Sequence, residues 1–268
     1  MLTNEKLISV LLVVLIFLPI GIVYGDEPIL ISISSNLDKV VFDGKWTDSN
    51  EWKQSSYNRL YFDDGTEIHL RTAHQNNFIY VQIDFATDMI IDKGEDSAVI
   101  CFDTMNDKTL LPQLDDYCFS TTINGKNSFT YQGNSIPAIN GYFTKIPNDE
   151  NFIAIGSVSD KHDRYNKTPH TSYEFKIPLE LLGRSNNYGF YVSVFDAHSQ
   201  THYSWPLKTE KQSLTSISSP SKWGDLISPD KSLPEFDLPL LAFLLMPSLL
   251  TLIIFSKSHT FKILSFKN

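Results

Sequence analysis

Side chains that can bind a metal ion crowd one short stretch of the sequence, between two runs of apolar residues. They are Asp103, Asn106, Asp107, Asp115 and Asp116. Carboxylate and amide oxygens are the ligands that Ca²⁺ prefers, so this acidic loop is a candidate calcium site. The spacing is not that of an EF-hand, in which ligands occupy alternate positions before a glycine and a distant glutamate. The alternative is an acidic loop that is simply solvated.

The two cysteines of the chain, Cys101 and Cys118, stand at the two ends of this loop. Each precedes a phenylalanine in a predicted strand, so the two side chains can face each other across a hairpin. We therefore expect a disulfide, which for a loop this short contributes about 3 kcal/mol in the chain-entropy treatment. Such a bridge requires an oxidising compartment. The alternative is a pair of buried free thiols, because two thiolates without a histidine at zinc-site spacing form an incomplete metal site.

Alternating apolar residues predict the strands that position the loop. Ala98, Ile100 and Phe102 share one face of a strand before it, and Phe119, Thr121 and Ile123 alternate in the same way in a strand after it. Further strands are predicted at 40–42, 66–72, 78–85, 128–132, 140–145, 152–158, 172–177, 188–195, 202–206 and 223–227, with a helical turn at 180–182 and loops at 159–171 and 207–222. Many short strands without a long helical period indicate an all-β fold, an antiparallel β-sandwich of jelly-roll or immunoglobulin-like type.

Two apolar runs near the ends of the chain predict flanking hydrophobic helices. Residues 7–24 have the composition of a secretory signal with cleavage after Gly25, or alternatively of an uncleaved anchor helix. Residues 238–255 form a charge-free run followed by a tail that contains only basic charges, which places the tail in the cytosol and the middle of the chain outside. The predicted organisation is a signal peptide at 1–25, one domain at 26–233 and a membrane anchor or sorting segment at 234–268.

The composition argues against some classes of function. The net charge of −9 argues against nucleic-acid binding, which calls for basic patches. Asn166 begins an Asn-Lys-Thr glycosylation acceptor, which agrees with exposure outside the cell. The sequence has no GxSxG, HExxH or phosphate-loop motif. Among its 31 acidic residues, no two are singled out as the carboxylate pair that a glycosidase needs.

Aromatic side chains are the candidates for binding a sugar, because the faces of sugar rings are apolar while their edges need hydrogen bonds. On loops or sheet faces the candidates are Trp46, Tyr57, Tyr61, Tyr131, Tyr203 and Trp205. Packing in the core is the alternative for each of them. It is the expected role of Trp52 and Trp223.

Two further groups of polar residues are expected on the surface. The acidic run 84–96 is interpreted as a plain surface connection. Asp196, His198 and His202 lie close together near a strand end, where they could bind a metal or titrate near neutral pH. A surface loop is the expected role of this second group.

Several pieces of the sequence, taken in order, resemble a known family. The segment VVFDGKWTDSNEW at 40–52 is similar to the opening of family 9 carbohydrate-binding-module-like domains, in which a first strand runs into an Asp-Gly turn and a downstream tryptophan. The segments IHLRTAHQNNFIYVQIDF at 68–85, YEFKIPLELLG at 173–183, and SWP with KWGDLI at 204–227 resemble the second hairpin, the Ile-Pro-Leu strand end and the closing strand of that family. The resemblance covers 38–228. It implies a β-sandwich related to DOMON-like folds that binds a ligand.

A second resemblance lies just before the C-terminal apolar run. The segment Leu-Pro-Glu-Phe at 233–236 is similar to the PEF-type sorting signal of archaeal surface proteins. That resemblance implies removal of the terminal helix by an archaeosortase-like membrane enzyme. The sequence departs from the pattern at Asp237, where a small residue is common, and in its longer tail after Phe255. A plain single-span anchor is the alternative.

The sequence thus predicts a membrane-tethered, extracytoplasmic domain at the cell surface that binds carbohydrate or an envelope glycan without catalysis. Calcium is the cofactor that the acidic loop suggests. One alternative is a structural or adhesive surface protein that binds no small ligand. Another is an exported glycoside-active enzyme or a haem redox module, the latter suggested by Met105 because some relatives of this fold hold haem through methionine.

Overall fold

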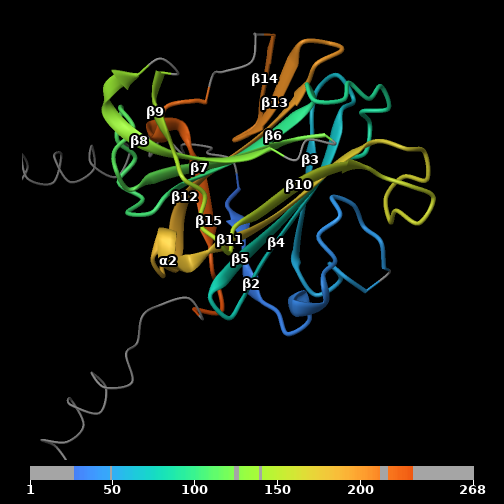
Figure 1. Ribbon diagram of the computed structural model, residues 1–268, viewed down its shortest axis with the longest axis horizontal. Helices are drawn as coiled ribbons and strands as arrows, with labels where there is room; N and C mark the ends of the chain where they lie inside the picture. Colours follow the sequence, from blue (N-terminus) through green and yellow to red (C-terminus); the bar gives the residue numbers. More distant parts are fainter. Residues whose placement is uncertain (1–26, 49, 124–126, 139–140, 212–216, 232–268) are drawn as a thin grey trace, which may run out of the picture.

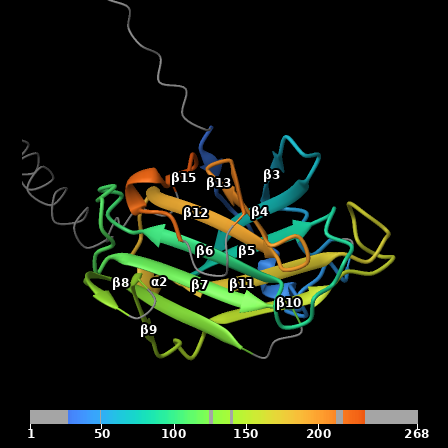
Figure 2. The same cartoon turned by 90° about the horizontal axis from the view of Figure 1, so that it is seen from above.

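The computed structural model describes residues 27–48, 50–123, 127–138, 141–211 and 217–231. In this part of the chain the strands form two sheets of a β-sandwich (Figures 1 and 2), which confirms the predicted fold class. The predicted signal peptide, the sorting segment and both flanking helices lie outside the described residues. Among the residues that are described, no helix is long and apolar enough to cross a membrane.

The larger sheet has nine strands within the described residues. They are β1 (Ile29–Leu30), β6 (Ser97–Asp103), β7 (Asp116–Thr122), β8 (Ser128–Ala138), β9 (Gly141–Ile146), β12 (Asn187–Asp196), β13 (Thr201–Trp205), β14 (Lys208–Lys211) and β15 (Gly224–Ile227). Their order is β1-β15-β12-β6-β7-β8-β9, while β13 pairs with β12 and β14 pairs with β13. Neighbouring strands are antiparallel except for β1 and β15. The predicted hairpin around the acidic loop is β6 and β7.

The smaller sheet has six strands in the same part of the chain. They are β2 (Ser32–Ile33), β3 (Ser56–Tyr61), β4 (Glu67–Gln75), β5 (Phe78–Phe85), β10 (Ile153–Val158) and β11 (Thr171–Pro178). Their order is β10-β11-β5-β4-β2, and β3 pairs with the other half of the same edge of β4. The predicted helical turn is α2 (Leu179–Leu182), which ends at Gly183 with a φ of +69° that favours glycine. Two 3-10 turns, η1 (Leu37–Lys39) and η2 (Pro220–Lys222), complete the elements.

Alternation along β5 shows how the sequence divides the core from the outer face of the smaller sheet. Ile79, Val81 and Ile83 point between the sheets and are fully buried in the main apolar cluster. Gln82 and Asp84 point to the opposite face, because successive side chains of a strand alternate. Both are nevertheless 0 % exposed. The outer face of this sheet is therefore covered by other parts of the chain.

One cover is the N-terminal segment 34–55. Trp46 and Trp52 pack there in a second apolar cluster with Tyr80 of β5. The indole N–H of Trp52 donates to Glu174 Oε1 at 2.9 Å, and the backbone N–H of Gly44 donates to Glu174 Oε2 at 2.8 Å. Burial raises the pKa of Glu174 to about 8. The second cover is the segment 159–170 between β10 and β11, which carries the buried residues Asp163 and His170.

The structure removes one predicted strand and adds four that were not predicted. Residues 40–42 form no strand, because Val40 caps η1 by donating its backbone N–H to Leu37 O at 3.3 Å. The strands β1, β2, β3 and β14 lie where none was predicted. β1 and β2 have two residues each, and β3 and β14 are short strands with mixed polar composition, so the pairing partner and not the local pattern decides that each is extended.

Candidate functional site

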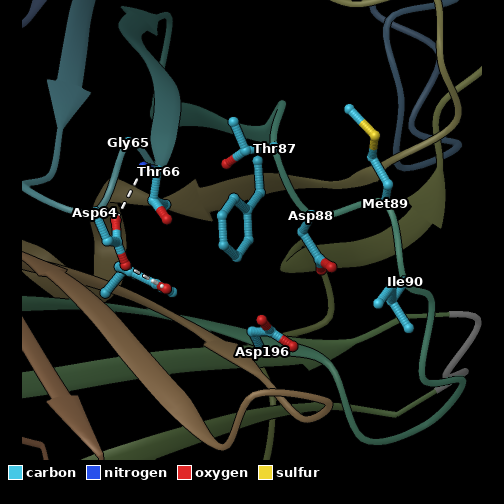
Figure 3. A pocket seen from close by; sticks show the side chains of 10 residues that line it. Asp64, Gly65, Thr66, Thr87, Asp88, Met89, Ile90 and Asp196 are labelled. Carbon is cyan, nitrogen blue, oxygen red and sulfur yellow. Dashed lines mark hydrogen bonds between the residues drawn. The ribbon is translucent and has the colours of Figure 1, made fainter.

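A hollow of about 360 Å³ opens at one end of the sandwich, where both sheets contribute (Figure 3). It is lined by Asp64, Gly65, Thr66, Phe85, Thr87, Asp88, Met89, Ile90, Asp196 and Tyr203. The lining residues from 64 to 90 belong to the β3–β4 turn and to the end of β5 with its following segment, whereas Asp196 ends β12 and Tyr203 lies in β13. The volume falls within the range of about 300–1,000 Å³ found for small-molecule sites. We call this hollow the acidic pocket.

The β3–β4 turn places the first carboxylate of the acidic pocket. Gly65 has a φ of +90°, which lets the chain reverse so that Asp64 Oδ1 accepts the backbone N–H of Thr66 at 2.9 Å. Asp64 Oδ2 accepts the hydroxyl of Tyr203 at 2.8 Å. Although burial acts in the opposite direction, these hydrogen bonds hold the pKa of Asp64 below its ordinary value. Asp64 is therefore an ionised acceptor that is fixed by donors from both sheets.

The other two carboxylates are also held by donors. Asp88 is 5 % exposed, and its Oδ2 accepts the hydroxyl of Thr171 at 2.9 Å. Burial raises the pKa of Asp88 to about 7, and nearby carboxylates add to the effect. Asp196 Oδ1 accepts the backbone N–H groups of His198 and Ser199 at 2.9 and 3.1 Å, and its Oδ2 accepts the Ser199 hydroxyl at 2.6 Å. Donors already hold all three carboxylates in place, so a ligand would not have to order them.

Apolar side chains complete the acidic pocket. The ring of Phe85 packs edge to face against Tyr203, with 5.5 Å between the centroids. Met89 and Ile90 are each 51 % exposed on the other side. Figure 3 shows the three carboxylates on different sides of the hollow. No lysine, arginine or histidine is among the described residues that line it. The arrangement offers hydrogen-bond acceptors together with an apolar wall, and it disfavours anions.

The interpretation of the acidic run 84–96 as a plain surface connection is wrong. Asp84 and Asp96 are 0 % exposed, and Asp88 is nearly so. The segment folds back over the end of the sandwich, because Asp96 Oδ1 accepts the backbone N–H of Ala197 at 3.0 Å and Thr171 donates its backbone N–H to Asp88 O at 3.2 Å. Nothing in the local pattern of this run indicates such partners, since they lie 83 and 101 residues away.

Three of the predicted sugar-binding aromatic residues are buried. Trp46, Tyr203 and Trp205 are 1 %, 6 % and 3 % exposed. The Trp46 ring is covered by the guanidinium groups of Arg71 and Arg164, 5.1 and 5.6 Å from its centroid. Burial leaves Trp46 no ring face to offer a sugar, so that prediction is corrected, whereas Trp205 lines a second hollow and its role stays a prediction. Tyr203 reaches the acidic pocket but anchors a carboxylate there.

The remaining aromatic candidates do not converge on one site. Tyr57 is 45 % exposed and shares with Trp205 the lining of a second hollow, about 470 Å³, along the edge strand β3. Tyr61 is 59 % exposed on the same strand. Tyr131 is half-buried beside the two cysteines. The core contains the two tryptophans predicted there, Trp52 and Trp223.

The acidic loop brings together three of its five predicted calcium ligands. Asp103, Asp115 and Asp116 each offer one carboxylate oxygen, and these oxygens lie within 4.8 Å of one another. Asp116 is 1 % exposed, yet its Oδ1 has no hydrogen-bond partner among the described residues, and the same holds for Asn106 Oδ1. Asp107 is exposed and stands outside the group.

The predicted disulfide between Cys101 and Cys118 is confirmed. The two cysteines lie directly opposite each other in the register of β6 and β7. Both are fully buried on the outer face of the larger sheet, where they pack with Phe143, Tyr191 and Trp223. The bridge therefore closes the acidic loop at its base.

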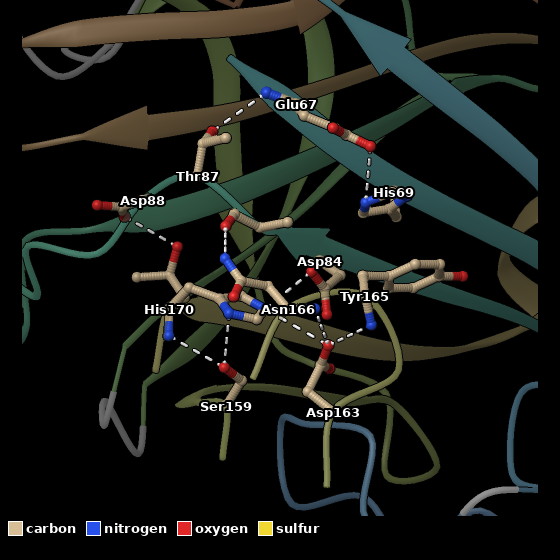
Figure 4. Close-up of polar contacts among 12 residues, drawn as sticks. Glu67, His69, Asp84, Thr87, Asp88, Ser159, Asp163, Tyr165, Asn166 and His170 are labelled. Carbon is tan, nitrogen blue, oxygen red and sulfur yellow. Dashed lines mark hydrogen bonds and ion pairs between the residues drawn. The ribbon is translucent and has the colours of Figure 1, made fainter. Parts of the chain in front are cut away.

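A buried chain of polar contacts has the residue types of a hydrolytic triad (Figure 4). Ser159 Oγ lies 2.8 Å from His170 Nδ1, and His170 Nε2 lies 2.9 Å from Asp84 Oδ1. Ser159 is only 3 % exposed, and its Oγ also accepts the backbone N–H of His170 at 3.0 Å. A nucleophile must reach its substrate. The burial of Ser159 therefore argues against a catalytic role for this chain of contacts.

Two smaller predictions concern exposed polar residues. Asn166 is half-buried, and its side-chain Nδ2 donates to Ala86 O at 2.8 Å. Glycosylation at Asn166 stays a prediction. It would require this side-chain amide to turn outward. His198 is exposed as expected, and the ring of His202 packs against Phe195 at 4.5 Å. Asp196 does not form a site with these histidines and instead lines the acidic pocket.

Comparison with known proteins gives a likeness in fold. Neither a protein-family model nor a curated protein matches the sequence. A family 9 carbohydrate-binding module from Caldicellulosiruptor kristjanssonii, solved with cellotriose, is 17 % identical, covers 79 % of this chain and 100 % of its own, and has a TM-score of 0.45. A family 9 module from the same organism, solved with glucose, is 15 % identical over 75 % of this chain and 95 % of its own, with a TM-score of 0.47. A putative carbohydrate-binding protein from Bacteroides uniformis ATCC 8492 is 12 % identical over 75 % of this chain and 100 % of its own, with a TM-score of 0.44. At this level the likeness concerns the fold alone.

Proposed function

We propose that this protein is a non-catalytic carbohydrate-binding module that holds a neutral sugar in the acidic pocket. The observation that carries the proposal is the convergence of three fixed carboxylates on a hollow that also has the exposed apolar side chains of Met89 and Ile90 in its lining. Carboxylates accept hydrogen bonds from sugar hydroxyl groups, and aromatic or aliphatic side chains cover the C–H face of the ring. The resemblance of four sequence segments to the family 9 modules points to the same class of ligand.

The charge of the acidic pocket narrows the class of sugar. The ionised carboxylate of Asp64, with no basic side chain among the described lining residues, disfavours uronic acids and phosphorylated sugars. Hydroxyl groups of a neutral hexose, by contrast, can donate hydrogen bonds to Asp64 and Asp196, and the hexose brings no negative charge next to these carboxylates. We therefore propose a neutral hexose unit of an envelope glycan as the ligand.

Calorimetric titration of the full chain tests this function, with glucose, cellotriose and glucuronate as probes. Wild type is expected to bind at least one of the two neutral sugars and not glucuronate. Asp64→Ala and Asp196→Ala should weaken that binding at least tenfold, because each removes an acceptor and the donors behind it are left unpaired. Glu150→Ala, which removes an exposed carboxylate that does not line the pocket, should bind as wild type does. Wild type that binds neither sugar, or alanine variants that bind as well as wild type, would refute the proposal.

We further propose that the acidic loop holds a calcium ion next to the disulfide. Three convergent carboxylates are hard ligands, and the unpartnered, buried Oδ1 of Asp116 is an acceptor that a cation would satisfy. Calorimetry in calcium and in chelator is the test. The melting temperature of wild type should rise in calcium by mass action. Asp116→Asn should reduce the rise and Asp107→Asn, outside the cluster, should preserve most of it. Equal melting temperatures of wild type in calcium and chelator would leave the loop as solvated surface.

The location at the cell surface is also a proposal, with the domain outside the membrane and the terminal segment as its tether. The disulfide supports an oxidising compartment, and the apolar runs of the sequence support export and anchoring. An archaeosortase-like enzyme as a processing partner follows from the PEF-type segment at 233–236. Protease added to intact cells should digest the domain and leave the tail intact. Digestion of the tail from outside would contradict this orientation.

One observation favours a second candidate function, adhesion to a neighbouring envelope protein. The acidic loop exposes Met105, Leu110 and Leu114 at 74 %, 74 % and 69 %. Exposed apolar side chains gathered on one loop are typical of a contact surface. A photo-reactive residue at position 114 should cross-link to an envelope protein in intact cells if adhesion is the function. A cross-linking pattern equal to that of a probe at Glu150 would exclude this loop as the contact.

A further inference from the structure

A buried cluster beneath the segment 159–170 has the donor atoms of a metal site. Asp84 of β5 meets Asp163 and His170 of the covering segment, and one ligand atom from each lies within 4.8 Å of the others. All three residues are 0 % exposed. Figure 4 shows the three side chains turned toward one another from two separate parts of the chain.

The contacts of His170 determine which ring nitrogen carries a proton. Its Nδ1 lies 2.7 Å from Thr168 O, which only accepts, and 2.8 Å from Ser159 Oγ, which can accept as well, so an N–H at Nδ1 satisfies both contacts. The neutral ring then presents the lone pair of Nε2 to the carboxylates, with Asp84 Oδ1 at 2.9 Å and Asp163 Oδ1 at 3.9 Å. A lone pair cannot face two anions without a positive charge between them. That charge is either a second proton or a metal ion.

The carboxylates themselves indicate more than one positive charge. Asp163 Oδ1 accepts the backbone N–H groups of Tyr165 and Asn166 at 2.7 and 3.0 Å, which fixes the side chain. The second oxygens, Asp84 Oδ2 and Asp163 Oδ2, are buried and have no hydrogen-bond partner among the described residues. An imidazolium would neutralise one of the two carboxylates, so the other would have to hold a proton of its own. A divalent cation with a neutral imidazole would neutralise the whole cluster.

We infer that Asp84, Asp163 and His170 bind a first-row divalent transition metal of the Zn²⁺ class. Zn²⁺ binds imidazole nitrogen at about 2.0–2.1 Å and carboxylate oxygen at about 2.0–2.2 Å. Two such ligands at the tetrahedral angle are about 3.3–3.5 Å apart, which lies between the distances from His170 Nε2 to Asp84 Oδ1, 2.9 Å, and to Asp163 Oδ1, 3.9 Å. Ca²⁺ takes oxygen ligands, so the imidazole disfavours it here. The hydrogen bond from Nδ1 to Thr168 O is the orienting contact that metal-bound histidines usually make.

The inferred ion would clip the covering segment to the smaller sheet. Asp163 lies in the first half of the segment and His170 ends it, while Asp84 lies on the strand beneath it. Between them Tyr165 stacks on His69 of β4 with 3.7 Å between the ring centroids. The clip therefore holds an aromatic layer on the outer face of the sheet. This role uses none of the three carboxylates of the acidic pocket.

The inference is tested on the full chain, which is purified in detergent, stripped with chelator and then loaded with Zn²⁺ or Co²⁺. The zinc content and the visible spectrum of the cobalt form are measured. Wild type should retain one Zn²⁺ at this site per chain after gel filtration, and Co²⁺ should give a visible absorption band in its place. His170→Gln and Asp163→Asn should weaken zinc binding at least tenfold and remove the cobalt band. His162→Gln, an exposed histidine of the same segment, and Asp116→Asn, in the acidic loop, should keep both signals.

A measurement on wild type alone covers the case in which His170→Gln does not fold. X-ray absorption of the zinc-loaded protein should show one imidazole among oxygen ligands at about 2.0–2.2 Å. The inference is overturned if wild type retains no zinc, if folded His170→Gln retains as much, or if the bound zinc shows no imidazole ligand. Unaltered zinc binding in a sugar-binding-deficient Asp196→Ala protein would support the separation of the two sites.

Discussion

Reduction of the bridge between Cys101 and Cys118 is expected to destabilise the domain by about 3 kcal/mol. The two residues are 17 apart in sequence. In the chain-entropy treatment a loop of this length removes about 10 cal/mol/K from the unfolded state, which is about 3 kcal/mol at 25 °C. The register of β6 and β7 pairs the two cysteines directly, so we expect the reduced thiols to keep the native strand geometry. The main effect should therefore arise in the unfolded state.

Urea unfolding with and without reductant measures this difference. With a slope of about 3 kcal/mol per molar urea, a loss of about 3 kcal/mol lowers the midpoint by about 1 M. The Cys101→Ala/Cys118→Ala variant should lose somewhat more, because it also removes two buried sulfur atoms from the cluster with Trp223. Reductant should leave the midpoint of this variant unchanged, which controls for effects of the reagent itself.

Two results would refute the reasoning. Thiol labelling of the denatured, unreduced protein should find no free cysteine, and two reactive thiols would exclude the bridge. A midpoint that does not move on complete reduction would show that the loop contributes no entropy difference, because the unfolded chain already holds its ends together.

Calcium binding should weaken along with stability on reduction, since the bridge closes the loop that carries Asp103 and Asp116.

Three further predictions concern pH, a buried hydrogen bond and the end of the chain. Burial raises the pKa of Asp88 in the native state to about 7. Between about pH 4 and pH 7 the native state therefore holds a proton that the unfolded state has lost. The free energy of unfolding should fall as pH rises through this range, by up to about 1.4 kcal/mol per pH unit. Asp88→Asn should flatten that part of the stability profile measured by urea unfolding, and a profile parallel to wild type would contradict the assignment. Trp52→Phe removes the N–H that reaches Glu174 at 2.9 Å and should cost about 1–3 kcal/mol. A loss below about 0.5 kcal/mol would show that this hydrogen bond contributes little. If sorting removes the terminal helix, mass spectrometry of the mature protein should lack the peptide Ile263–Asn268, and its recovery from most of the pool would favour a plain anchor.

Local pattern in the sequence determined the strands that bury an apolar face. The run from Phe78 to Phe85 was predicted with the bounds that the structure has, because its alternation depends only on the two-residue period of a strand. The β6–β7 hairpin and its disulfide followed in the same way, since two alternating strands around one loop place Cys101 opposite Cys118. The turn ending at Gly183 was also local, because the end of a short helix needs a residue that tolerates a positive φ.

Only the tertiary structure decided which polar and aromatic side chains are buried. Trp46 and Asp84 have nothing in their neighbouring sequence to distinguish them from exposed residues, yet the segments at 34–55 and 159–170 cover the outer face of the smaller sheet and bury both. The acidic pocket joins Asp64 to Tyr203 across 139 residues of sequence. Such sites depend on how the two sheets and their covering segments pack. That packing is set by contacts between distant parts of the chain, and the periodicity of a single strand does not report on such contacts.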